Sequence, residues 1–134
     1  MRSLKFALAA LLFAAAAASP AAAAELTTQK SADRGVTVEV TPRNLSAGAG
    51  TWDFKVVLDT HAGDLNDDLL KTTLLLDDMG GKYIPAQWEG PGPGGHHREG
   101  VLKFKPVSPA PATIELQIRR AGEAIPRSFR WQLK

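Results

Sequence analysis

Apolar and polar residues alternate in short segments along most of the chain after residue 35. The clearest segment begins at Trp52, where Trp52, Phe54, Val56 and Leu58 recur at every second position. A period of two is typical of a strand with one buried and one solvated face. Seven such segments are predicted as strands: residues 36–41, 52–59, 72–77, 82–88, 101–105, 114–119 and 128–133.

These seven short strands, with turn residues between them and no long helical pattern, predict an all-β fold. We expect an immunoglobulin-like antiparallel β-sandwich over residues 35–134, preceded by a flexible lead-in at residues 25–34. Pro85 favours an edge position or a bulge within 82–88, because proline donates no ladder hydrogen bond. One short helix is expected at Asp64–Leu70, with Asp64 capping its first turn. The spacing of Cys and Trp in antibody domains is absent, so the prediction concerns architecture only.

The first 24 residues have the pattern of a secretory signal peptide. Arg2 and Lys5 precede the apolar run Phe6–Ala18, and small residues ending at Ala24 fit a signal peptidase site. The alternative is an uncleaved membrane anchor, but Pro20 interrupts the apolar stretch and no basic cluster follows it. We therefore expect a periplasmic or secreted product with no stable membrane insertion after cleavage.

Removal of this segment changes the charge balance. The whole chain has 16 Lys and Arg against 14 Asp and Glu, and loss of Arg2 and Lys5 leaves 14 of each. The neutral remainder gives no support to nucleic-acid binding, which needs a clustered basic excess. The chain has no cysteine, so neither a disulfide nor a thiolate metal site is available.

Strand order predicts which loops lie together. If successive strands reverse direction, the loops after the second, fourth and sixth strands share one end of the sandwich. These loops contain, in turn, His61 with Asp64, then His96 with His97 at the end of a run of glycine and proline, then Arg120, Gly122 and Glu123. All three histidines of the chain are therefore expected at the same end.

A histidine cluster of this kind suggests a metal site. Imidazole nitrogens and carboxylate oxygens bind Zn(II) and Cu(II), so His61, His96, His97 and Asp64 are the candidate ligands. A blue-copper centre is excluded because it requires a thiolate. The alternative is that these histidines are ordinary solvated loop residues, since the four donors lack a compact spacing.

Two further residues are candidates for contact with a ligand or partner. Trp88 stands just before the glycine-rich loop, and Arg98 follows it, where flexible backbone allows an anionic ligand to approach. No serine elbow, metalloprotease motif or reactive cysteine is present, so no catalytic residue is predicted and the protein is not expected to be an enzyme.

Three functions are open at this point. The first is a small periplasmic binding module whose histidine end engages a transition metal, Zn or Cu(II), or a periplasmic protein partner. The second is a structural or protein-interaction domain without metal, which uses an exposed strand edge at residues 82–88. The third is an enzyme of unknown class.

Overall fold

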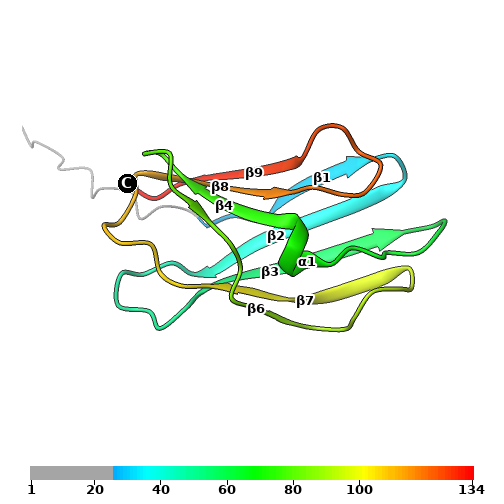
Figure 1. The fold of residues 1–134 in the computed structure, drawn as a ribbon, viewed down its shortest axis with the longest axis horizontal. Helices are drawn as coiled ribbons and strands as arrows, with labels where there is room; N and C mark the ends of the chain where they lie inside the picture. Colours follow the sequence, from blue (N-terminus) through cyan, green and yellow to red (C-terminus); the bar gives the residue numbers. More distant parts are fainter. Residues whose placement is uncertain (1–25) are drawn as a thin grey trace, which may run out of the picture.

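The computed structural model describes residues 26–134, so the predicted signal peptide lies outside the described part of the chain. This part is all-β and forms two antiparallel sheets (Figure 1). Sheet A has the order β1-β2-β3-β7-β6, and sheet B has the order β5-β4-β8-β9. The elements are β1 (Gln29–Asp33), β2 (Val36–Asn44), β3 (Trp52–Thr60), α1 (Leu69–Thr72), β4 (Thr73–Asp77), β5 (Lys82–Tyr83), β6 (Gln87–Glu89), β7 (His97–Phe104), β8 (Thr113–Ile118) and β9 (Arg127–Gln132).

The core lies between the two sheets in a β-sandwich-like arrangement, and it confirms the inward faces that the alternation predicted. Every second residue of β2, β3, β8 and β9 is buried along most of each strand. The ring of Phe54 in sheet A lies 5.6 Å from that of Phe104 and 5.8 Å from that of Trp131 in sheet B. Aromatic contacts of this geometry add to the apolar burial that holds the sheets together.

Residues 29–33 form a strand, which corrects the prediction of a flexible lead-in at 25–34. β1 pairs with β2 from Gln29 opposite Val40 to Asp33 opposite Val36, through a turn in which Arg34 and Gly35 have positive φ. The strand has little apolar alternation because it lies at the edge of sheet A and none of its side chains is fully buried. The strand is also held by hydrogen bonds from β9, which is distant in sequence, and a local pattern does not report such contacts.

The single strand predicted at residues 82–88 is two short strands in different sheets. β5 pairs with β4 in sheet B, and β6 pairs with β7 in sheet A, while Ile84–Ala86 crosses between them. Pro85 stands at the middle of this crossing, where its missing N–H and fixed φ end the ladder. In Figure 1 the green segment from β4 to β6 passes from one sheet to the other on the near side.

The predicted helix is shorter and later than expected. α1 covers only Leu69–Thr72, and Asp68, not Asp64, occupies the N-cap position, without a side-chain cap bond. Residues 61–68 form a loop, and two of its carbonyl groups, those of Leu65 and Asp67, accept hydrogen bonds from a β7 side chain described below. Within residues 26–134 no helix is long and apolar enough to cross a membrane.

Candidate functional site

Three loops meet at one end of the molecule, as strand alternation predicted. We call residues 61–68, 90–96 and 119–126 together the loop end. The Thr60 amide donates to the His96 carbonyl at 2.9 Å, and the Leu65 amide donates to the Gly95 carbonyl at 2.9 Å. The strand predicted at residues 82–88 is in fact two strands, β5 and β6. Both lie between loops 61–68 and 90–96 in the sequence, so these two loops still meet at the same end.

Arg98 connects two of these loops from inside the protein. Its side chain is only 2% exposed, and its guanidinium donates to the carbonyls of Leu65 at 3.2 Å, Asp67 at 2.6 Å and Pro91 at 3.1 Å. The first two acceptors belong to loop 61–68 and the third to loop 90–96. One buried cation therefore fixes both loops through their backbone.

The surroundings of Arg98 compensate its charge without a direct carboxylate partner. Burial lowers the pKa of the guanidinium, and the negative charges of Asp67 and Asp68 oppose this shift. The guanidinium carbon lies 5.7 Å from the centre of the Trp88 ring, which is a cation–π contact. The Trp88 indole nitrogen donates to the Pro91 carbonyl at 2.9 Å, and its half-buried ring packs against the core. Arg98 and Trp88 thus form the inner support of the glycine-rich loop.

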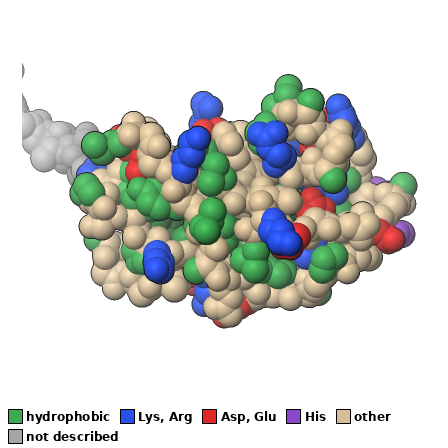
Figure 2. Space-filling view, viewed as in Figure 1, with side chains coloured by type: hydrophobic (Ala, Val, Ile, Leu, Met, Phe, Trp, Pro, Cys, Tyr) green, Lys and Arg blue, Asp and Glu red, His purple; other side chains and the backbone are tan. Residues whose placement is uncertain are grey.

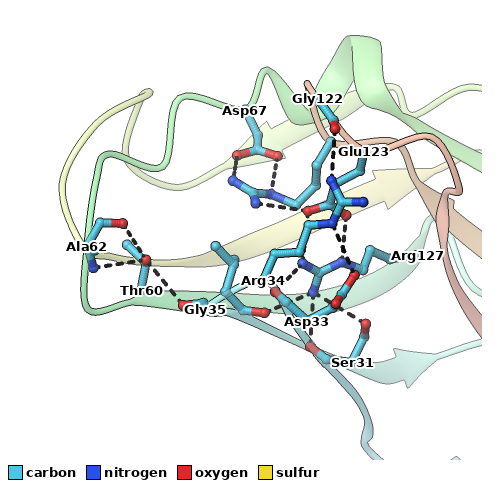
Figure 3. Close-up of polar contacts among 12 residues, drawn as sticks. Ser31, Asp33, Arg34, Gly35, Thr60, Ala62, Asp67, Gly122, Glu123 and Arg127 are labelled. Carbon is cyan, nitrogen blue, oxygen red and sulfur yellow. Dashed lines mark hydrogen bonds and ion pairs between the residues drawn. The ribbon is translucent and has the colours of Figure 1, made fainter.

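A second network, which is largely buried, ties the third loop to loop 61–68 (Figure 3). The Arg120 guanidinium donates through Nε and Nη2 to the two carboxylate oxygens of Asp67, at 2.9 and 3.0 Å. It also lies 3.3 Å from Glu123. Burial acts to lower the pKa of Arg120, but the bonds and charges of Asp67 and Glu123 outweigh it and raise that pKa. This paired geometry gives loops 61–68 and 119–126 one relative position.

Arg127 extends the network to the β1–β2 hairpin. Its Nε donates to Glu123 at 2.8 Å, and its Nη atoms donate to the carbonyls of Ser31 at 3.1 Å, Asp33 at 2.9 Å and Val36 at 3.0 Å. Figure 3 shows the Arg127 side chain directed at this hairpin. The hydrogen bond from Arg127 lowers the pKa of Glu123 below its ordinary value, although burial opposes the shift. The side chain of Glu123 is 7% exposed, and it joins the half-buried Arg120 to the buried Arg127.

His97 is occupied by two carboxylates on the outer face of sheet A. It stands opposite Asp59 in the register of β7 and β3, and its Nδ1 is hydrogen-bonded to the Asp59 carboxylate. Its Nε2 lies 3.6 Å from Glu99, which is itself paired with Lys55 at 2.8 Å. The hydrogen bond to Asp59 is the main reason that the pKa of His97 is raised, and Glu99 adds to it.

The other predicted ligands are exposed. His61 borders a shallow hollow of about 420 Å³ beside the β1–β2 turn, and His96 and Asp64 lie at the surface of their loops. The four candidates therefore share one end of the molecule without forming a compact donor set. Among residues 26–134, no three His, Asp or Glu side chains are grouped so that they could hold a metal ion.

We did not predict from the sequence that Arg98 and Arg127 organise this end as buried hydrogen-bond donors. Arg98 is in phase with the inward-facing Leu102 and Phe104, and Arg127 is in phase with Phe129 and Trp131. A cation at an inward position of an otherwise apolar face is a signal for a buried donor. That signal was available from the alternation alone.

The fold and the loop end define a small all-β domain with a sandwich-like arrangement and an internally braced set of loops at one end. Comparisons with protein-family models, with curated proteins and with solved structures find no match to this chain.

Proposed function

We propose that the protein is a small exported binding module that contacts a partner protein through the loop end and carries out no catalysis. The observation that carries this proposal is the bracing of the loops by buried guanidinium groups. Arg98 and Arg127 each donate to three backbone carbonyls, and Arg120 forms a bidentate pair with Asp67. These cations hold exposed residues such as His61 and His96 on a fixed base.

The energetics support a role in recognition. A buried ion pair adds little net stability compared with apolar side chains of similar volume, because both charges must leave water. What such a network does supply is a single conformation for the groups it binds. Loops that are already ordered lose little conformational entropy when they engage a partner, so their contacts translate more fully into affinity.

The strand order supports an immunoglobulin-like type for the sandwich. In their order across each sheet, β2-β3-β7-β6 corresponds to strands A, B, E and D of that fold, and β4-β8-β9 corresponds to C, F and G. The loops after β3 and after β8 then correspond to the B–C and F–G loops. In variable domains those two loops contribute to the binding site, so the analogy favours the same end of this molecule.

Site-specific crosslinking in the host periplasm tests the proposal. A photoreactive amino acid is placed at His61 or at His96, and, as matched controls, at the exposed positions Ala47 and Ser108 in loops at the opposite end. We expect a discrete protein adduct from the first pair only. No adduct from either loop-end position, or equal adducts from both ends, would overturn the proposal.

Zn(II) or Cu(II) is the second candidate ligand of the same end. One observation favours it: within the described residues, neither the His61 nor the His96 imidazole makes a hydrogen bond or ion pair, and both lie at the loop end. Calorimetric titration of residues 25–134 with Zn(II), Cu(II) and Ni(II) tests this idea against His61→Ala and the paired His96→Ala, His97→Ala variant. Binding no tighter than that of a surface histidine, or binding unchanged in the variants, would exclude it.

A further inference from the structure

An exposed isoleucine divides two hollows on the near face of the molecule. Ile84 lies in the segment that crosses from β5 to β6, and 77% of the residue is exposed. It lines a hollow of about 280 Å³ beside β4 and a second hollow of about 370 Å³ beside β5. We call Ile84 and these two hollows the Ile84 groove. It shares only Arg119 and Pro126 with the loop end, and both line the first hollow.

All of the charged side chains that line the groove are basic. The first hollow contains Lys71 and Arg119, and the second contains Lys82 and Lys105, whereas no Asp or Glu lines either one. The apolar part of the lining includes Leu74, Tyr83 and Pro85 around Ile84. Figure 2 shows hydrophobic side chains interspersed with Lys and Arg on this face.

Most of these cations have no internal partner. Within residues 26–134, Lys82, Lys105 and Arg119 make no ion pair, and Lys71 lies at the longer distance of 3.8 Å from Asp68. The sequence after the signal peptide has equal numbers of acids and bases, so this basic excess is local. An acidic ligand would therefore meet uncompensated positive charge on both sides of Ile84.

The groove also follows a partly unpaired strand. β4 pairs with β8 along all five residues but with β5 only at Leu75 and Leu76, so Thr73 and Leu74 have no strand beside them on the β5 side. The hydroxyl groups of Thr72 and Thr73 are buried without a hydrogen-bond partner among the described residues. An open edge of this kind accepts an added strand through main-chain hydrogen bonds.

We propose that the Ile84 groove binds an extended, acidic segment of a partner protein. The segment lies along the open edge of β4, packs an apolar side chain against Ile84, and places carboxylates near Lys71 and Arg119 on one side and Lys82 on the other. A concave lining and a free strand edge suit a peptide better than the flat surface of a membrane. His61 and His96, which the crosslinking experiment probes, do not line the groove, so the proposed function can fail while this one holds.

A peptide titration followed by two-dimensional NMR of the ¹⁵N-labelled protein tests the proposal. The probe is a short blocked peptide in which Glu alternates with Val, and the comparison probe has Lys in place of Glu. Vesicles of phosphatidylglycerol and phosphatidylcholine test the membrane alternative. The protein variants are Ile84→Asp, the pair Lys82→Glu and Arg119→Glu, and the control Met79→Asp, which changes an apolar residue that is 80% exposed and lines neither hollow.

We expect the Glu peptide to shift signals of the groove, and the Ile84→Asp and charge-reversal variants to bind it about tenfold more weakly or worse. That factor corresponds to loss of burial of one isoleucine side chain. Met79→Asp should bind like the parent protein. Equal binding of the Lys peptide, shifts centred elsewhere, equal weakening by Met79→Asp, or binding to vesicles without binding to the Glu peptide would each overturn the proposal.

Discussion

Replacement of Arg98 is the sharpest test of how the loop end is held together. In Arg98→Ala, the carbonyls of Leu65 and Pro91 each keep a second donor, a loop amide at 2.8 Å and the Trp88 indole at 2.9 Å. The Asp67 carbonyl loses its 2.6 Å bond and has no other donor among the described residues. The substitution therefore leaves one buried acceptor unpaired and a void where the long side chain was.

These two effects differ in size and can be separated. An unpaired buried acceptor costs about 1–3 kcal/mol, and the void left by truncating a large buried side chain costs about 2–5 kcal/mol. Removal of a desolvated cation offsets part of this loss. We expect a decrease in the free energy of unfolding of about 3 kcal/mol for Arg98→Ala and about 1 kcal/mol for Arg98→Met, because methionine fills much of the same space.

Urea denaturation followed by tryptophan fluorescence measures both values. Arg43→Met is the control, because Arg43 is exposed and makes no ion pair within residues 26–134. That control should change stability by less than about 0.5 kcal/mol. Hydrogen exchange should also accelerate at the Leu65 amide in Arg98→Ala, since its loop loses an anchor. Equal losses for alanine and methionine, or a loss for alanine within the range of the control, would refute the packing and hydrogen-bond reasoning.

Three further predictions concern separate contacts. Asp59→Asn should lower the pKa of His97 toward its ordinary value in an NMR titration, because the Asp59 carboxylate is the main cause of the raised pKa; an unchanged pKa would contradict this pairing. Gly100→Ala should cost about 1–3 kcal/mol in a denaturation experiment, because its methyl group would lie 2.5 Å from a carbonyl oxygen of β6, whereas Gly50→Ala, with nothing within 4 Å, should not. Glu123→Gln should destabilise the protein by about 3 kcal/mol at neutral pH, because the buried Arg127 and the half-buried Arg120 would lose their shared carboxylate. The pKa of Glu123 is depressed, so its contribution is present above the carboxyl pKa of the unfolded chain and is lost as pH falls through the folded value; the gap between wild type and Glu123→Gln should close in acid, and a gap independent of pH would count against the ion pairs.

The raised pKa of His97 has the opposite consequence for pH. Its interaction with Asp59 stabilises the folded state fully below the unfolded pKa of histidine and is lost as pH rises through the higher folded pKa. His97 and Asp59 are both more than half exposed, so solvent screens this pair and its effect on stability is small.

The interior strands were predictable because each has one buried face. Trp52, Phe54 and Leu58 all point into the core, so apolar residues occur at every second position of β3 and the strand is visible in the sequence. β1 was not predictable in this way, because its anchors come from the far end of the chain. The Arg130 amide donates to the Gln29 side chain at 2.8 Å, across 101 residues of sequence.

The fourth strand shows a different limit of local pattern. Alternation in 82–88 reports a half-buried extended segment, and both β5 and β6 satisfy that description. It does not report which sheet each half joins. Pro85 was recognised as a disturbance of the ladder, but the sheet change that it permits depends on the neighbours on each side, β4 and β7.

At the loop end, topology was more informative than residue chemistry. Alternating strand direction placed His61 with His96 correctly, because only the order of strands and turns was needed. The expectation that Arg98 faces a ligand followed from its flexible glycine neighbours, whereas its position in β7 directs it inward. Phase along the strand decides the orientation of a side chain, and loop composition does not.

Two buried arginines, Arg98 and Arg127, and the half-buried Arg120 hold the loops of the loop end in place. Removing a guanidinium from water costs free energy, which its hydrogen-bond acceptors offset while they stay in place. Opening one loop removes acceptors from the guanidinium bound to it, so that part of the desolvation cost is no longer offset. Arg98 couples two loops to the core, and Glu123 couples Arg120 to Arg127 and hence to the β1–β2 hairpin. We therefore expect the loops of the loop end to open together with the sheets rather than one at a time. A partner that contacts His61 and His96 meets a surface that has no ordering step left to make.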